Sequence, residues 1–253
     1  MIALVGNLSR DLFPGPETRV GGGAYHGARA LRRLHVPARV ITRCAAAERE
    51  LLLPPLVRLG TPVRWIRGET TSTFAFEFHG EQRTMEVEAV GDAWRPSSVE
   101  VPSRTTWVHL AALFRGEFPA DTVAALARRV RVSLDAQGLV RVPELGPLRL
   151  DADYDPEVLR HVWLLKVADE EAEVIGDVTA LGVKEVVVTH GSRGSTVHAN
   201  GSSEFVPARA LDVNATGAGD AFAVAYVAGR EAGLRPVGAA RRATAVVAAV
   251  LSG

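Results

Sequence analysis

The feature that most constrains the fold is a regular alternation of short apolar segments with amphipathic ones. The short segments are rich in aliphatic and β-branched residues, as strands of a buried parallel sheet are, and they span residues 2–5, 39–42, 107–110, 130–134, 162–165 and 185–189. The amphipathic segments predict helices over 24–34, 45–53 (ending at Pro54 and Pro55), 120–129, 170–181, 220–232 and 237–251. Strands that alternate with helices predict an α/β fold in which helices cover both faces of a mainly parallel sheet.

One stretch, residues 63–90, interrupts this alternation with strand patterns alone. Its segments STFAFEF and RTMEVEAV alternate apolar and polar residues, which is typical of an antiparallel sheet with one wet face. We therefore predict a single α/β domain over 1–253. A small β lid is inserted into it, formed by residues 63–90 with part of 11–20.

The charges of the chain balance, with 29 Lys and Arg against 29 Asp and Glu in 253 residues. A net charge of zero gives no electrostatic reason to expect nucleic acid or an anionic membrane as a partner, and the pair Arg128 and Arg129 is interpreted as a solvated helix face. The single cysteine, Cys44, excludes an internal disulfide, which fits a reducing cytosol. The sequence shows neither a secretory leader pattern nor an apolar run of about 18 residues. We expect a cytoplasmic protein.

Polar residues follow several predicted strands at the point where each strand ends. Asp135 and Gln137 follow the fourth strand, and Lys166 follows the fifth. His190 follows the sixth strand, and Asp11 comes shortly after the first. Ligands of open parallel sheets bind beyond the carboxyl ends of the strands, so we expect the functional site at this edge.

The clearest chemical signal is the turn Gly217-Ala218-Gly219, which leads into an apolar helix with Asp220 in its first turn. Backbone N–H groups at such a turn form an anion site, and glycine lets a phosphate approach the backbone closely. A carboxylate beside an anion site has a purpose if it takes the proton from a hydroxyl that attacks a phosphoryl group. The alternative is that Asp220 merely caps a buried helix.

The segment that begins at Thr216, TGAGDAF, resembles the C-terminal signature of the ribokinase-like (PfkB-type) carbohydrate kinases. Gly21 and Gly22, with His26 four residues on, resemble the N-terminal di-glycine motif of that family, and residues 187–194 (VVTHGSRG) resemble its nucleotide loop. The three motifs lie in the order of the family, so the resemblance covers essentially the whole chain. It implies a three-layer sandwich with a small β lid, and an ATP-dependent kinase that acts on a hydroxyl of a sugar, polyol or inositol-like substrate.

The resemblance also implies roles for single residues. Asp220 is the catalytic base, and the turn that precedes it forms the anion hole for the transferred phosphate. The substrate-binding positions are Asp11, Gly21, Gly22 and His26. The nucleotide-binding positions are Thr189, Gly191, Gly194, Asn214 and Thr216. Glu171 helps to place Mg²⁺ through water, so ATP and Mg²⁺ are the expected cofactors.

Several positions depart from the family pattern. Ala168 replaces the Asn that usually begins the magnesium motif, and Asn214 replaces an acid that shapes a monovalent-cation site. His26 replaces a sugar-binding Asn, and residues 43–48 lack the expected Gly and Asp. These changes argue against ribose and against a standard fructose-phosphate kinase. The run D-x-Q-G-x-x-R over residues 135–141 instead resembles an inositol-kinase-like branch.

Some residues have two interpretations from the sequence. Arg83 follows the turn of the predicted lid, and it either closes on the substrate or nucleotide or is a solvated strand residue. Asp135 and Gln137 either contact the substrate or form a structural turn.

The predicted lid carries Phe74, Phe76 and Phe78 on one face, because side chains two apart on a strand share a face. That face either covers the substrate or pairs with a second subunit, and the resemblance favours a homodimer through the lid. The same phenylalanines make a nucleoside kinase a competing hypothesis, since they can clamp a base. A third hypothesis is a non-catalytic sugar or nucleotide sensor, which the altered magnesium motif favours and Asp220 opposes.

Overall fold

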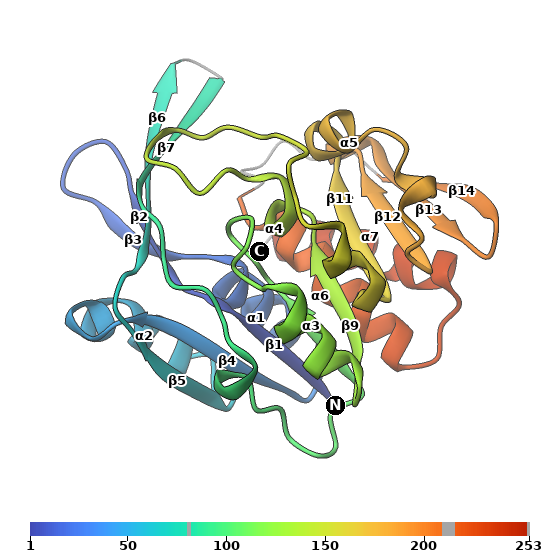
Figure 1. Cartoon of the computed structure of the whole chain (residues 1–253), viewed down its shortest axis with the longest axis horizontal. Coiled ribbons are helices and arrows are strands. Elements are labelled where there is room, and N and C mark those ends of the chain that lie inside the picture. The colour runs from blue at the N-terminus through green and yellow to red at the C-terminus, as the bar shows by residue number, and fades with distance from the viewer. Residues whose placement is uncertain (80–81, 209–215, 252–253) are drawn as a thin grey trace.

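A nine-stranded sheet forms the centre of the protein in the computed structural model, which describes residues 1–79, 82–208 and 216–251 (Figure 1). Its strand order is β14-β13-β12-β11-β9-β8-β1-β4-β5. The strands from β12 to β5 pair in parallel, and β13 and β14 extend the sheet by antiparallel pairing. The strands are β1 Ile2–Asn7, β4 Ala38–Ala45, β5 Val63–Gly68, β8 Trp107–Leu110, β9 Arg131–Asp135, β11 Leu164–Ala168, β12 Glu185–Thr189, β13 Gly194–Ala199 and β14 Ser202–Pro207.

Helices cover both faces of this sheet, because successive side chains of a strand point to opposite faces. Ile2 and Leu4 pack among α1, α6 and α7, whereas Ala3 and Val5 pack with α3 and α5. The helices are α1 Gly23–Arg33, α2 Arg49–Val57, α3 Ala120–Ala127, α4 Gln137–Val140, α5 Asp169–Ile175, α6 Ala218–Glu231 and α7 Pro236–Leu251. The 3₁₀ turns are η1 Ala46–Glu48, η2 Pro96–Ser98, η3 Pro156–His161, η4 Val178–Leu181 and η5 Gly191–Arg193. The predicted α/β fold with a mainly parallel sheet is confirmed. In the described parts of the chain, no helix combines the length and apolar character needed to cross a membrane.

A second, smaller sheet has the order β10-β7-β6-β2-β3 and projects from one end of the large sheet (Figure 1). Its strands are β2 Ser9–Leu12, β3 Thr18–Gly21, β6 Ser72–His79, β7 Gln82–Ala89 and β10 Gly146–Pro147. Phe74 and Phe76 are buried against Leu113 and Phe114, which follow β8. One face of the small sheet is therefore seated on the large domain.

The structure differs from the expected elements at several places, each with a local cause. β5 pairs in parallel with β4 in the large sheet, so within residues 63–90 only the part from Ser72 onward belongs to the small sheet. α2 continues through Pro54 and Pro55, because Leu52 and Leu56 hold both of its turns in the core.

The helix expected over 170–181 breaks after Ile175, because Gly176 has a φ of 83° that ends it. The strands β13 and β14 form a hairpin that was not expected. Asn200 and Gly201 connect them with φ values of 53° and 73°, as in the Asn-Gly turns that favour hairpins.

Glu185, the first residue of β12, fixes the position of α6. Its buried carboxylate accepts hydrogen bonds from the Tyr226 hydroxyl at 3.1 Å and from Arg230 Nη2 at 2.7 Å. Both donors lie in the C-terminal half of α6. The helix is thereby tied to the sheet so that its N-terminus lies at the carboxyl edge of the parallel strands.

Candidate active site

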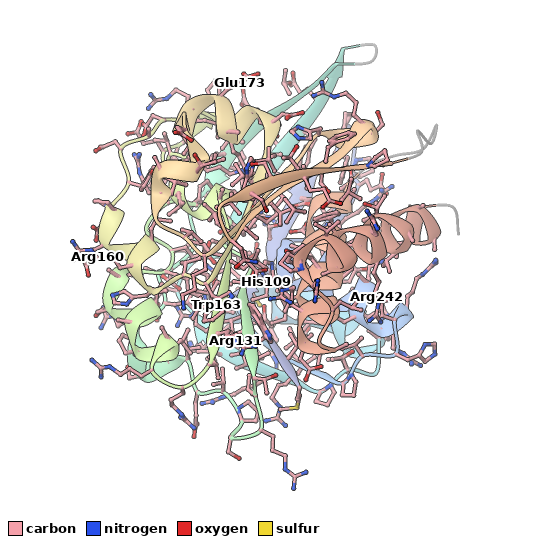
Figure 2. The ribbon with its side chains drawn as sticks, turned by 90° about the vertical axis from the view of Figure 1, so that its right-hand side faces the viewer. His109, Arg131, Arg160, Trp163, Glu173 and Arg242 are labelled. Atoms are coloured by element: carbon pink, nitrogen blue, oxygen red, sulfur yellow. The ribbon has the colours of Figure 1, made fainter. Side chains whose placement is uncertain are left out.

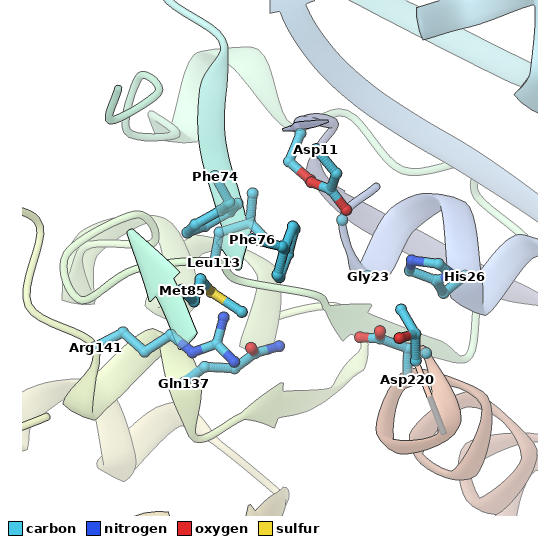
Figure 3. A pocket seen from close by; sticks show the side chains of 14 residues that line it. Asp11, Gly23, His26, Phe74, Phe76, Met85, Leu113, Gln137, Arg141 and Asp220 are labelled. Carbon is cyan, nitrogen blue, oxygen red and sulfur yellow. The ribbon is translucent and has the colours of Figure 1, made fainter. Parts of the chain in front are cut away.

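A cavity of about 360 Å³ lies at the carboxyl edge of the large sheet, where the small sheet meets it (Figure 3). The side chains of Phe74, Phe76 and Met85 reach it from the small sheet, and Asp220 faces it from α6 (Figure 3). The complete lining is Ser9, Asp11, Gly22, Gly23, His26, Phe74, Phe76, Met85, Leu113, Gln137, Arg141, Thr216, Gly217 and Asp220.

The start of α6 forms one wall of the cavity. Gly217 adopts a φ of 78°, a conformation that favours glycine, and its carbonyl accepts the first bond of the helix from the Ala221 N–H. The first N–H groups of a helix have no partner inside the helix, and the helix dipole adds positive potential there. The turn Gly217-Ala218-Gly219 can therefore receive an anion, as its sequence predicts.

Three glycines allow the polar groups of the cavity to approach the backbone. A Cβ on Gly23 would lie 2.6 Å from Asp220 Oδ1, and a Cβ on Gly217 would lie 2.6 Å from His26 Nδ1. A Cβ on Gly21 would lie 2.0 Å from Asp11 Oδ2. The motifs around residues 21 and 217, far apart in the sequence, are thus in direct contact and shape one site.

One side of the cavity carries an acid and a neutral imidazole. Asp11 is buried on β2 and accepts a hydrogen bond from the Ser9 hydroxyl at 2.6 Å. Burial lowers the pKa of His26 to about 4, against the opposing effect of the Asp11 carboxylate, so the ring is uncharged near neutral pH. A neutral imidazole both donates and accepts, which suits hydroxyl groups.

Behind Asp220 lies a buried group of charges. The ammonium of Lys166 is 3.4 Å from Asp135 Oδ2 and 4.0 Å from Glu171 Oε2, and all three side chains are buried. Burial raises the pKa of Asp220, while the positive charges of Lys166 and Arg141 oppose that rise. Burial lowers the pKa of Lys166, but Asp135, Glu171 and Asp220 outweigh it and raise the pKa above its usual value. Lys166 therefore stays charged.

Glu171 has an oxygen donor of the kind that Mg²⁺ prefers, but its surroundings exclude a dedicated metal cage. Its Oε2 accepts the Ala168 N–H at 2.7 Å, and the Lys166 ammonium lies beside it. Among the residues that the structure describes, no group of three or more His, Cys, Asp or Glu could hold a metal ion. Contact with Mg²⁺ through water fits this arrangement.

The predicted nucleotide loop, residues 187–194, lies at the same edge but outside the lining of the cavity, whereas the predicted nucleotide-binding residue Thr216 lines it. Thr189 ends β12, and its hydroxyl donates to the Val167 carbonyl at 3.2 Å. Gly191 and Gly194 have φ values of 55° and 129°, and a Cβ on Gly194 would lie 2.2 Å from the Val206 carbonyl oxygen. Asn214 is outside the described residues.

Some of the predicted substrate-binding residues line the cavity, and others do not. Asp11, Gly22, His26 and Gln137 line the cavity, while Gly21 only makes room for Asp11. Asp135 is buried beneath the cavity with Lys166. The predicted strand position of Arg83 is observed on β7, but its side chain is outside the described part.

Sequence reasoning did not assign a role to Lys166 or to Arg141, although both belong to the site. Lys166 follows a predicted strand at the carboxyl edge, and Arg141 ends the run that begins at Asp135. These two positions in the sequence could have indicated that Lys166 and Arg141 belong to the site. Arg141 lines the cavity beside Gln137, opposite Asp220 (Figure 3).

A mainly parallel sheet with a helix N-terminus and a carboxylate at its carboxyl edge is typical of α/β proteins that bind anionic ligands. The chain belongs to the pfkB family of carbohydrate kinases, whose family model matches residues 9–253. It is 30% identical over 193 residues to an inositol 3-kinase of Zea mays, with 74% of this chain and 50% of that relative covered. An inositol 3-kinase of Oryza sativa subsp. japonica is 32% identical over 151 residues, which are 56% of this chain and 38% of the relative. The chain thus spans about half the length, or less, of these curated relatives.

Solved structures resemble the whole chain. A pyrophosphate-dependent kinase in the ribokinase family, complexed with a pyrophosphate analog and myo-inositol, matches with a TM-score of 0.86 and 27% identity, covering 100% of this chain and 95% of that one. The Arabidopsis thaliana ribokinase complexed with ribose and ATP matches with a TM-score of 0.74 and 20% identity, covering 100% and 92%. The predicted family and the ribokinase-like three-layer fold are confirmed.

The contact between Gly23 and Asp220 gives a first prediction. Gly23→Ala places a Cβ where Asp220 Oδ1 lies, and also 2.8 Å from the Ala111 Cβ, so the carboxylate has to move. We expect turnover to fall about 100-fold, since a displacement of about 1 Å in a catalytic group has that effect. The control is Gly238→Ala on α7, where the nearest atom to the new Cβ is 3.8 Å away. Wild-type turnover in Gly23→Ala with an unchanged melting temperature would contradict this geometry.

Proposed function

We propose that this protein transfers a phosphoryl group to a hydroxyl of a small cyclic polyol of the inositol class, with Asp220 as the base. The observation that carries the proposal is the position of the Asp220 carboxylate, which faces the cavity from the first turn of α6 (Figure 3). At that point it lies beside an anion-binding helix N-terminus and within the electrostatic influence of Lys166.

The substrate hydroxyl oxygen bonds to the terminal phosphorus of the donor while the bond from that phosphorus to its bridging oxygen breaks. The hydroxyl proton passes to Asp220, and the leaving group departs as ADP or, from pyrophosphate, as phosphate. The amides of the Gly217-Ala218-Gly219 turn and the cations Lys166 and Arg141 stabilise the charge on the transferred group.

The lining of the cavity supports an uncharged, hydroxyl-rich acceptor. Asp11 and neutral His26 offer hydrogen bonds to several hydroxyls, and Gln137 offers both a donor and an acceptor. Phe74 and Phe76 close the apolar side and exclude water from the reacting atoms. The likeness to inositol 3-kinases supports an inositol-type acceptor over ribose.

Two phosphate donors are candidates. ATP with Mg²⁺ is supported by the family and by the nucleotide-loop pattern of residues 187–194, and Glu171 is the residue that would hold the water shell of the ion. Pyrophosphate is supported by the 0.86 TM-score to a pyrophosphate-dependent kinase. Mg²⁺ bound to either donor would neutralise its phosphate charge.

A nucleoside kinase and a non-catalytic sensor have less support. A nucleoside kinase needs an aromatic clamp, and Phe74 and Phe76 line the cavity, but the nucleoside kinase from Burkholderia thailandensis is only 20% identical and shares the fold alone. A non-catalytic sensor has no need of a carboxylate aimed at an anion site. Pairing of two copies through the small sheet stays a prediction, and light scattering of the purified protein tests it.

Asp220→Asn is expected to lower turnover by about 10²–10⁴, because the amide keeps the shape but cannot accept a proton. The measurement is product formation, followed by ³¹P NMR, with ATP–Mg²⁺ or pyrophosphate–Mg²⁺ against inositols, sugars and nucleosides. The matched control is Asp121→Asn, which changes an exposed aspartate in the first turn of α3 and should leave turnover unchanged. Full activity in Asp220→Asn, or no product from any pair, would overturn the proposal.

Lys166→Met is expected to shift the pH profile of kcat/KM. Asp220 must be deprotonated to act as a base, so the rate rises as pH passes through its pKa. That pKa is already raised by burial, and Lys166 holds it down. Removing the ammonium raises the pKa further, so the acidic limb of the profile moves to higher pH. Arg58→Met, which changes an exposed arginine at the end of α2, should leave the profile in place. An unmoved limb in Lys166→Met would exclude Asp220 as the titrating group.

A further inference from the structure

A second cavity lies at the opposite edge of the large sheet, where the parallel strands begin. It has a volume of about 600 Å³ and is bounded by the end of α3, the end of η3 and the residues just before β9, β11 and β12. Figure 2 shows Arg131 and Trp163 side by side in this region, with Glu173 of α5 at the far end of the molecule. We call this cavity the basic groove, and define it by Arg128, Arg129, Arg131, Lys184, Trp163 and Thr105.

The basic groove has an excess of positive charge. Arg128, Arg129, Arg131 and Lys184 are exposed, and in the described parts of the chain none of them has a carboxylate oxygen within 4.0 Å. Arg160, at the rim, is already paired with Glu157 at 2.9 Å. Because the whole chain has a net charge of zero, this gathering of cations is local.

A structural role at helix ends does not account for this charge. The C-terminus of α3 carries about half a negative charge, which one cation near its last turn offsets. Four cations around the groove leave a surplus of about three charges. A solvated helix face explains the exposure of Arg128 and Arg129, but not their convergence with Arg131 and Lys184 on one cavity.

Two of the cations are held in place by aromatic rings. The Arg131 guanidinium lies 5.0 Å from the Trp163 ring centroid and 5.6 Å from that of Trp107, and Lys184 Nζ lies 3.9 Å from that of Trp163. Trp163 is itself fixed, because its indole N–H donates to the buried Glu185 carboxylate at 3.4 Å. Side chains ordered in advance lose less entropy when a ligand binds.

The inner wall of the groove has a polar atom with no partner. Thr105 lines the groove and is 6% exposed, and its hydroxyl makes no hydrogen bond within the described residues. The hydroxyl oxygen itself is enclosed by protein, so Thr105 contributes to the shape of the groove and not to its charge.

We propose that the basic groove binds a small polyphosphate anion, either inorganic or as the phosphate tail of a nucleotide. Guanidinium groups match phosphate oxygens with paired hydrogen bonds, and three of the four cations are arginines. Four positive charges in a cavity of about 600 Å³ fit a compact anion of several charges. This site is distinct from the catalytic cavity, which lies at the other edge of the sheet.

The test is calorimetric titration of the full chain with sodium tripolyphosphate and, separately, with ATP, both without Mg²⁺. The groove variant Arg131→Gln/Lys184→Gln should bind tripolyphosphate about tenfold or more weakly than the wild type, because two charge-assisted contacts are lost. The charge-matched control Arg39→Gln/Arg58→Gln changes two exposed arginines outside the groove and should bind as the wild type does. Melting temperatures of all variants verify folding.

Two further arms separate the possible ligands and sites. In Gly219→Val, where the proposed donor site at α6 is blocked, equal affinity for both titrants identifies the phosphate groups alone as the ligand of the groove, and tighter binding of ATP identifies a nucleotide. Gly219→Val, which fills the anion site of α6, should leave tripolyphosphate binding to the groove intact. The proposal is overturned if the groove variant binds as tightly as the wild type, or if the control loses affinity equally. It is also overturned if a short single-stranded RNA binds more tightly than either anion. Because no turnover is needed, this outcome is independent of the kinase assay.

Discussion

Lys166 places an ammonium group among three carboxyl groups that the fold has taken out of water. Burial is the largest cause that raises the pKa of Asp135, Glu171 and Asp220, and in each case the Lys166 charge opposes that rise. Leaving one member of a buried ion pair unpaired costs about 3–5 kcal/mol, so the members of this group depend on one another. The position of β11 beside β9 brings Lys166 to Asp135, and the cap of α5 brings Glu171 to Lys166. The charges around Asp220 are therefore positioned by the strand pairing of the central sheet and by the start of α5.

The surroundings of that group are set by backbone positions rather than by large side chains. Gly23 and Gly217 allow α1 and α6 to meet with Asp220 and His26 between them. Glu185 ties the other end of α6 to β12, so the helix cannot turn away from the cavity. The small sheet adds the apolar cover through Phe74 and Phe76. Scaffold, anion site and cover come from different segments that converge on one edge.

Sequence patterns predicted the elements whose residues carry a local signal. The strand periodicity indicated the parallel sheet, and the small residues before Asp220 indicated the helix N-terminus, because both depend on neighbours in the chain. Contacts between distant segments leave no such signal. The pairing of Lys166 with Asp135, the parallel pairing of β5 with β4 and the gathering of Arg131 with Lys184 all depend on strand order, which periodicity does not contain. The prolines of α2 were misleading, because burial of Leu52 and Leu56 outweighed the local preference.

The contact of Gly23 with Asp220 joins two helices that lie far apart in the sequence, α1 and α6. During synthesis, the segment that contains Gly23 leaves the ribosome long before the one that contains Asp220. β1, β4 and α1 can pack early, since they are close in sequence, but α6 is then absent from the face that it covers. The growing chain therefore leaves an apolar face of the sheet uncovered, and the cavity lacks Asp220, until α6 has been synthesised. The position of α6 in the sequence thus delays assembly of the cavity until well after the first strands of the sheet have formed.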